Sequence, residues 1–166
     1  MDMSWPSVEL RRPRIESAAF LGLVQESRAE GYWMLTRLLA DWRNGTTRFS
    51  RRGEALLGGY VHGRLAGVCG LGVDPYVEGK RQGRVRHLYV SAAARRLGVG
   101  RALVRTAIVK AREHFGVLNV RATESSFEFY ERLGFVPVHG DEFVTHRIVF
   151  RPLARSLLQE RGVNVR

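Results

Sequence analysis

A short segment rich in arginine and glycine has the residue types that suit anion binding. Its sequence is Arg95-Arg96-Leu97-Gly98-Val99-Gly100-Arg101, and it lies between a predicted strand and a predicted helix. The first N–H groups of a helix lack partners within the helix, and the helix dipole adds partial positive charge there. Gly98 and Gly100 lack the Cβ atoms that would keep a diphosphate away from the backbone, and the arginines add long-range attraction. The segment therefore predicts a phosphate-binding turn.

Two other phosphate-binding motifs fit the chain poorly. A dinucleotide-binding fold needs an acidic residue about 20 residues after the glycines to hold a ribose, whereas Glu113 falls inside the predicted helix. A Walker loop needs Gly-Lys followed by Ser or Thr, and this triplet does not occur in the sequence.

The hydrophobic pattern predicts an α/β fold around this turn. Helical spacing over 19–27, with Ser17 as the cap, and over 32–42 gives two N-terminal helices. Alternation then predicts strands over 55–61, 64–73, 84–90, 117–122 and 143–150, and helices over 101–115 and 125–133, the latter stopped by Gly134. We expect a mixed, mostly antiparallel central sheet with helices on its faces.

Length and composition indicate one intracellular domain. The 166 residues are 45% hydrophobic and 26% charged, without repeats or linkers, so we expect a domain over 1–152 and a basic tail over 153–166. Cys69 is the single cysteine and lies in the apolar run 65–73, which excludes an intramolecular disulfide and favours the cytoplasm. No apolar run is long enough to span a bilayer, so we expect no membrane association.

The net charge of +11 raises the question of a polyanionic partner. Lys80 and Lys110 are the only lysines among 27 basic residues, and the arginines are spread from Arg11 to Arg166 without a continuous block. This dispersal makes nucleic acid an unlikely partner.

Two motifs resemble the hallmarks of the GNAT superfamily of N-acetyltransferases. Arg95-x-x-Gly98-x-Gly100, preceded by the strand His87-Leu88-Tyr89-Val90, resembles the acetyl-CoA signature of that family. Downstream, Phe129-Tyr130-Glu131-Arg132-Leu133-Gly134-Phe135 resembles its second hallmark. The resemblance covers roughly 55–150, while the N-terminal helices match only in kind.

The resemblance implies acetyl-CoA as cosubstrate, no metal, and a set of site residues. In the family, two central strands splay apart and the pantetheine arm enters the gap, where the main chain of Leu88, Tyr89 and Val90 would hold it and polarise the thioester carbonyl. Tyr130 would protonate the departing thiolate. The pyrophosphate and CoA contacts would come from Arg95, Arg96, Leu97, Gly98, Val99, Gly100, Arg101, Thr123 and Ser126, with Thr123 at a position where the family often has Asn.

The general base stays unassigned at this point. Many family members have a glutamate early in the strand before the phosphate turn, where this chain has Arg84 and Arg86. His87, Glu124, Glu78 and a water wire are the candidates; alternation puts His87 on the same side as Val85 and Tyr89. If Arg84 or Arg86 faces the acceptor, an amine that carries a carboxylate or phosphate would be favoured over a polyamine.

Two other interpretations compete with the interpretation as an enzyme. The chain could be a basic module that associates with nucleic acid or ribosomes, which would bind in a steeply salt-dependent manner. It could also bind acyl-CoA as a sensor without turnover. Dimers are common in such folds, so a homodimer is one possible assembly by analogy, and the sequence does not determine the oligomeric state.

Overall fold

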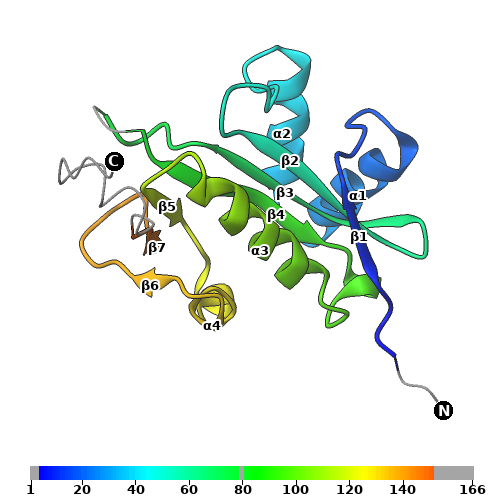
Figure 1. Ribbon diagram of the computed structural model, residues 1–166. Coiled ribbons are helices and arrows are strands. Elements are labelled where there is room, and N and C mark those ends of the chain that lie inside the picture. The colour runs from blue at the N-terminus through cyan, green and yellow to red at the C-terminus, as the bar shows by residue number, and fades with distance from the viewer. Residues whose placement is uncertain (1–3, 79–80, 152–166) are drawn as a thin grey trace, which may run out of the picture.

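The computed structural model describes residues 4–78 and 81–151, which form a seven-stranded sheet with helices on both faces (Figure 1). The strands are β1 (Val8–Arg11), β2 (Ala55–Val61), β3 (Arg64–Val73), β4 (Gly83–Val90), β5 (Val117–Val120), β6 (Val136–Pro137) and β7 (His146–Val149). The helices are α1 (Ala18–Ala29), α2 (Met34–Arg43), α3 (Val99–Arg112) and α4 (Phe127–Arg132), with short 3₁₀ turns η1 (Ala92–Ala94) and η2 (Glu124–Ser126). Within these ranges, no helix has both the length and the apolar character needed to cross a membrane. The basic tail predicted over 153–166 lies outside the described residues.

The sheet is mixed and mostly antiparallel, as predicted. Its order is β1-β2-β3-β4-β5-β7-β6, and β4 with β5 is the parallel pair among the described strands. The predicted hairpin at His62 and Gly63 is confirmed, since both residues have positive φ (49° and 73°), as a two-residue type I′ turn requires. The Ser17 cap is also confirmed, because its hydroxyl accepts a hydrogen bond from the Phe20 N–H.

Some boundaries differ from the predictions. The expected helix over 125–133 begins as the 3₁₀ turn η2, and the last strand is only His146–Val149. Two strands were not predicted: β1 and β6 have four and two residues, too few for alternation to be recognised. β1 exists because it pairs with β2, some 50 positions further along the chain.

Two apolar clusters lie on opposite faces of the sheet. One packs α3 against Leu57, Leu71 and Val85, and the other packs α1 and α2 against Leu56, Val68 and Tyr89. Figure 1 shows α3 across one face of β2 to β4, with α1 and α2 beyond the opposite face. The central strands are therefore buried on both sides.

A β-bulge in β4 reverses the side-chain alternation within the strand. Arg86 pairs with Gly70 and Tyr89 with Val68, so one extra residue of β4 lies opposite Cys69, and His87 there has a φ of 56°. Val85 consequently packs under α3, whereas Tyr89 packs under α1 and α2. The expectation that His87 shares one side with both Val85 and Tyr89 is thus wrong for Val85, because a bulge breaks the period of two.

β4 and β5 separate after the second residue of β4. Their parallel pairing consists of Gly83 with Leu118 and Arg84 with Asn119. Beyond Arg84, β5 stays paired with β7, while the part of β4 up to Val90 has no strand on its β5 side among the described residues. This opening places an unpaired strand edge in the middle of the sheet.

Candidate active site

The predicted phosphate turn leads directly into α3. Arg96 and Gly98 both have left-handed backbone (φ 64° and 82°), and Gly98 is the residue before the first turn of the helix. The N–H groups from Arg96 to Arg101 have no hydrogen-bond acceptor within the described residues, and the first turn carries no acidic side chain. The geometry therefore leaves a group of main-chain donors at the positive end of a 14-residue helix, which suits an anion.

Positions 98 and 100 of the turn have glycine for different reasons. Gly98 has a conformation that side chains disfavour, whereas a Cβ on Gly100 would make only ordinary contacts of 3.5 Å with Phe129 and Val90. The fold itself thus has room for alanine at position 100. A glycine at this position keeps the space beside the amides open.

A cleft of about 820 Å³ follows the gap between β4 and β5. It brings together eight of the predicted site residues: Leu88, Tyr89, Val90, Arg95, Gly100, Thr123, Ser126 and Tyr130. The turn residues Arg96, Leu97, Gly98, Val99 and Arg101 do not line it, and Val99 is buried in the core under α3. Arg95 and Gly100 connect the turn to the cleft. The phosphate turn and the strand edge are therefore continuous parts of one surface.

Tyr130 lines the cleft, and its hydroxyl forms no hydrogen bond within the described residues. Its ring is 5% exposed and packs edge-on against Phe129 and Phe135, at centroid distances of 5.1 and 5.3 Å. The hydroxyl has no hydrogen-bond partner within the described residues, and burial, with Cys69 nearby, raises the pKa of the phenol above its usual value. The phenol is therefore protonated throughout the neutral range and can donate a proton.

Small hydroxyl side chains line the β5 side of the cleft. The Thr123 hydroxyl lies 3.2 Å from those of both Ser125 and Ser126, and Ser126 also donates to the Thr123 carbonyl. Ser125 was not predicted as a site residue. These polar groups are exposed at the end of β5, where a hydroxyl can replace an amide as a ligand contact.

The opposite wall comes from the connection between α1 and α2 and from α2 itself, which the sequence motifs did not indicate. Its cleft-lining residues are Gly31, Tyr32, Trp33, Met34, Arg37 and Asp41. Tyr32 and Trp33 are exposed aromatic residues, at 42% and 54%. In the sequence, the aromatic pair between the two helices was the one signal that could have pointed to this wall. Helical periodicity alone does not reveal which part of the sheet a helix covers.

Two glutamates attach this wall to the end of β4. Glu26 accepts hydrogen bonds from the Ser91 hydroxyl and from the Ala92 N–H, the latter at 2.7 Å. Glu30 accepts from the Tyr89 hydroxyl and from Arg95, and the Arg95 guanidinium is the main cause that lowers the pKa of Glu30. Arg95 is thus held beside the cleft by an ion pair, and its Nε donates to the Val90 carbonyl.

Arg84 does not present a free charge to the acceptor. This finding corrects the expectation that Arg84 could bind a carboxylate or phosphate of the acceptor. Its side chain is 6% exposed and is bound to the fully buried Asp74, with 3.2 Å between Nη1 and Oδ2. It also donates to the Phe143 carbonyl. Burying a lone guanidinium is costly, so the chain supplies a carboxylate beside it. Arg86 remains, and it lines the cleft together with Arg37.

Of the residues considered as the base, His87 alone among the described residues lies on the cleft. Glu78 and Glu124 are exposed and do not line it. Burial of His87, followed by the charge of Arg86, lowers the pKa of its imidazole to about 4. His87 is therefore neutral at pH 7. Cys69 is buried, and burial raises the pKa of its thiol to about 12, in agreement with a structural role.

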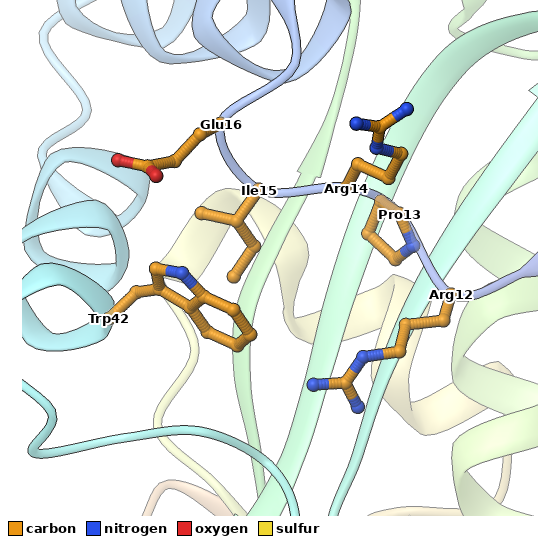
Figure 2. Close-up of a pocket in the computed structure, with 6 residues that line it drawn as sticks. All are labelled: Arg12, Pro13, Arg14, Ile15, Glu16 and Trp42. Carbon is orange, nitrogen blue, oxygen red and sulfur yellow. The ribbon is translucent and has the colours of Figure 1, made fainter.

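A second hollow of about 360 Å³ lies between the segment before α1 and α2 (Figure 2). Two of its charged groups have partners within the chain, because Arg12 donates to the carbonyls of Arg48 and Phe49, and Glu16 pairs with Arg43. Figure 2 shows Ile15 above the Trp42 ring, with the Glu16 carboxylate and the Arg14 guanidinium directed away from them. The hollow thus has an apolar wall, and its charged groups are either bound within the chain or directed away from that wall.

Comparison with known proteins identifies the family. The model of the acetyltransferase (GNAT) domain family matches residues 43–157, which is more than half of the chain. The protein therefore belongs to the GNAT acetyltransferase family. A search of curated proteins finds no match.

Solved structures share the same architecture. One is a protein from Exiguobacterium sp. 255-15 described as an acetyltransferase, which is 25% identical, with a TM-score of 0.76 over 95% of this chain and 99% of that chain. Another is the PaiA N-acetyltransferase from Thermoplasma acidophilum in complex with coenzyme A, which is 18% identical, with a TM-score of 0.63 over 87% and 99% of the two chains. A GNAT-family protein from Desulfovibrio desulfuricans is 19% identical, with a TM-score of 0.66 over 86% and 99%.

Proposed function

We propose that this GNAT protein transfers an acetyl group from acetyl-CoA to a primary amine by direct attack in a ternary complex. The single observation that carries the proposal is the continuity of three features in one cleft. Free amides at the start of α3 meet the unpaired edge of β4, and Tyr130 faces the same space. A neighbour of the same fold is known in complex with coenzyme A, which supports the choice of cosubstrate.

In this proposal the chain binds acetyl-CoA mainly through backbone. The amides from Arg96 to Arg101 bind the pyrophosphate, and the edge of β4 from Leu88 to Val90 binds the pantetheine arm as an added strand would. Thr123 and Ser126 contact the arm from the β5 side. A main-chain N–H of the β4 edge polarises the thioester carbonyl, where negative charge develops when the amine attacks.

Tyr130 then protonates the sulfur of the leaving group. Its raised pKa keeps the proton on the phenol until a thiolate forms beside it. The acceptor enters from the opposite wall, between α2 and β4. Because Arg37 and Arg86 line this half of the cleft, we propose an acceptor that carries a carboxylate, and the role considered for Arg84 passes to these two residues.

Calorimetric titration with acetyl-CoA, followed by an assay for release of the CoA thiol, tests this function. Acetyl-CoA at about 100 times its dissociation constant should stabilise the fold by roughly 2.7 kcal/mol. Thiol release should then require both the protein and an amine. Absence of affinity for acetyl-CoA in folded protein, together with salt-dependent binding to a DNA oligonucleotide, would instead favour the nucleic-acid module.

A further inference from the structure

His87 occupies an unusual backbone position in β4. It is the residue of the bulge opposite Cys69, and its φ of 56° is in the left-handed region that few residues with a side chain adopt. The bulge turns the imidazole toward α2, where its Nδ1 lies 3.0 Å from the Met34 carbonyl. Local strain of this kind is retained where the surrounding structure holds a side chain in one direction.

The Met34 carbonyl determines which nitrogen of His87 carries the proton. A carbonyl oxygen only accepts hydrogen bonds, so Nδ1 must be the N–H donor. In a neutral imidazole the other nitrogen, Nε2, then has a free lone pair. Nε2 has no hydrogen-bond partner within the described residues, and it is not sealed from solvent, because His87 lines the cleft.

The charged groups around His87 come from three elements. Arg86 of β4 and Arg37 of α2 both lower the pKa of the imidazole, while Asp41 of α2 lines the same cleft. Arg121, just after β5, lies on the far wall. From the segment before β2, the apolar Phe49 ring approaches edge-on, with 6.4 Å between the ring centroids.

We propose that His87 accepts the proton of the acceptor amine through Nε2, and that Arg86 and Arg37 make this step depend on an acceptor that carries a carboxylate. This inference rests on the acetyl transfer proposed above. The neutral amine attacks the thioester carbon, so a C–N bond forms and the C–S bond breaks. One amine proton passes to Nε2, and Tyr130 gives its proton to the sulfur. His87 returns its proton to solvent, and the Tyr130 phenolate takes one from solvent.

The coupling between the arginines and His87 is electrostatic. With the acceptor side empty, two positive charges oppose a third on the imidazole. A carboxylate between Arg86 and Arg37 offsets those charges, so His87 becomes a stronger base only when such an acceptor is present. An amine of the same shape without a carboxylate would leave the base weak.

The variant His87→Asn isolates the role of Nε2. Asn tolerates left-handed backbone, and its side-chain amide can replace Nδ1 as donor to the Met34 carbonyl, but it has no atom in the place of Nε2. We expect unchanged affinity for acetyl-CoA and a kcat lower by about 100-fold or more. The kcat of the wild type should also decrease toward acidic pH, with a midpoint between the lowered pKa of His87, about 4, and its unperturbed pKa of 6.5. This decrease should be absent from the variant. Wild-type kcat with an unchanged pH profile in His87→Asn would overturn the proposal.

The acceptor dependence is tested with matched amines. Because Tyr32 and Trp33 line the mouth of the cleft, suitable probes are phenylalanine with phenethylamine and tryptophan with tryptamine. We expect a preference of kcat/KM for the amino acid of about 10-fold or more, abolished by Arg86→Gln. A preference for the amine without a carboxylate, or one unaffected by Arg86→Gln, would contradict the coupling.

NMR of the imidazole nitrogens provides a test without an acceptor. At pH 7, His87 should be neutral with its proton on Nδ1, and Arg86→Gln should raise its pKa. A proton on Nε2 would overturn the inference, while thiol release by the wild type would leave the proposed acetyl transfer intact. The two failures are therefore distinguishable.

Discussion

Arg84 and Asn119 form the last pair between β4 and β5, and the cleft begins directly beyond them. The Asn119 amide donates to Oδ2 of Asp74 at 2.9 Å, and Arg84 donates to the same oxygen at 3.2 Å. All three residues are buried. A buried polar cluster thus marks the point where the strands divide, which is the feature that gives a strand edge to a ligand.

Loss of Arg84 should destabilise the fold rather than alter acceptor choice. Arg84→Met leaves Asp74 buried without its counter-charge, and we expect the free energy of unfolding to fall by about 3–5 kcal/mol in urea denaturation. Adding Asp74→Asn should restore part of this loss. The control Arg132→Met, in an exposed pair with Glu128, should change it by about 0.5 kcal/mol or less. Equal effects at the two arginines would refute the structural role of Arg84.

Gly100→Ala should separate stability from cofactor binding. A Cβ at this position makes only ordinary contacts in the fold, and alanine favours a helix over glycine by about 1 kcal/mol, so thermal stability should stay or rise. Affinity for acetyl-CoA in calorimetry should fall by about 10-fold or more, because the methyl group occupies space beside the amides. The matched control is Gly22→Ala in α1, where a Cβ meets nothing within 4 Å. Wild-type affinity in Gly100→Ala would show that no ligand approaches this backbone.

Tyr130→Phe should lower turnover without weakening the fold. The hydroxyl has no partner among the described residues, so its removal breaks no hydrogen bond within them. We expect kcat to fall by about 100-fold or more, while acetyl-CoA binds as before. The control is Tyr60→Phe on β2, outside the cleft. The sensor interpretation predicts instead that the protein has no turnover and that Tyr130→Phe leaves its function intact.

Acid should destabilise the protein partly through His87. Its pKa is about 4 in the folded chain and 6.5 when unperturbed, so between these values the unfolded state binds more protons. Stability attributable to the neutral imidazole is complete above pH 6.5 and decreases as the pH falls toward 4. The free energy of unfolding should drop by about 2–3 kcal/mol between pH 7 and pH 4.5 in excess of the drop in His87→Asn. Parallel pH curves for the two proteins would contradict the lowered pKa.

The sequence could predict those parts of the site that depend on local structure. The phosphate turn follows from Gly98 and the amphipathic helix after it, and both are short-range signals. The hairpin at His62 and Gly63 is equally local. Tyr130 could be assigned a role only through the resemblance of its motif, because apolar spacing alone would have placed it in the core, where its ring in fact packs.

The remaining parts depend on contacts between distant segments. The α1–α2 wall reaches the site through Glu26 and Glu30, whose partners Ser91 and Tyr89 lie about 60 residues away. The bulge at His87 adds one residue to a strand, which no pattern of alternating residues announces. Arg84 has the sequence context of a surface charge, and its burial depends on Asp74, the residue that follows the neighbouring strand β3.

An open strand edge on the outside of a protein invites other chains to add to it and aggregate. The unpaired part of β4 avoids this hazard, because it lies inside the molecule between the α1–α2 wall and the residues from Val120 to Tyr130. The hydrogen-bonding groups of this edge are therefore reached through the cleft and not from the outer edge of the sheet. The protein can therefore leave the backbone of β4 free to bind an extended ligand without offering an outer strand edge for self-association.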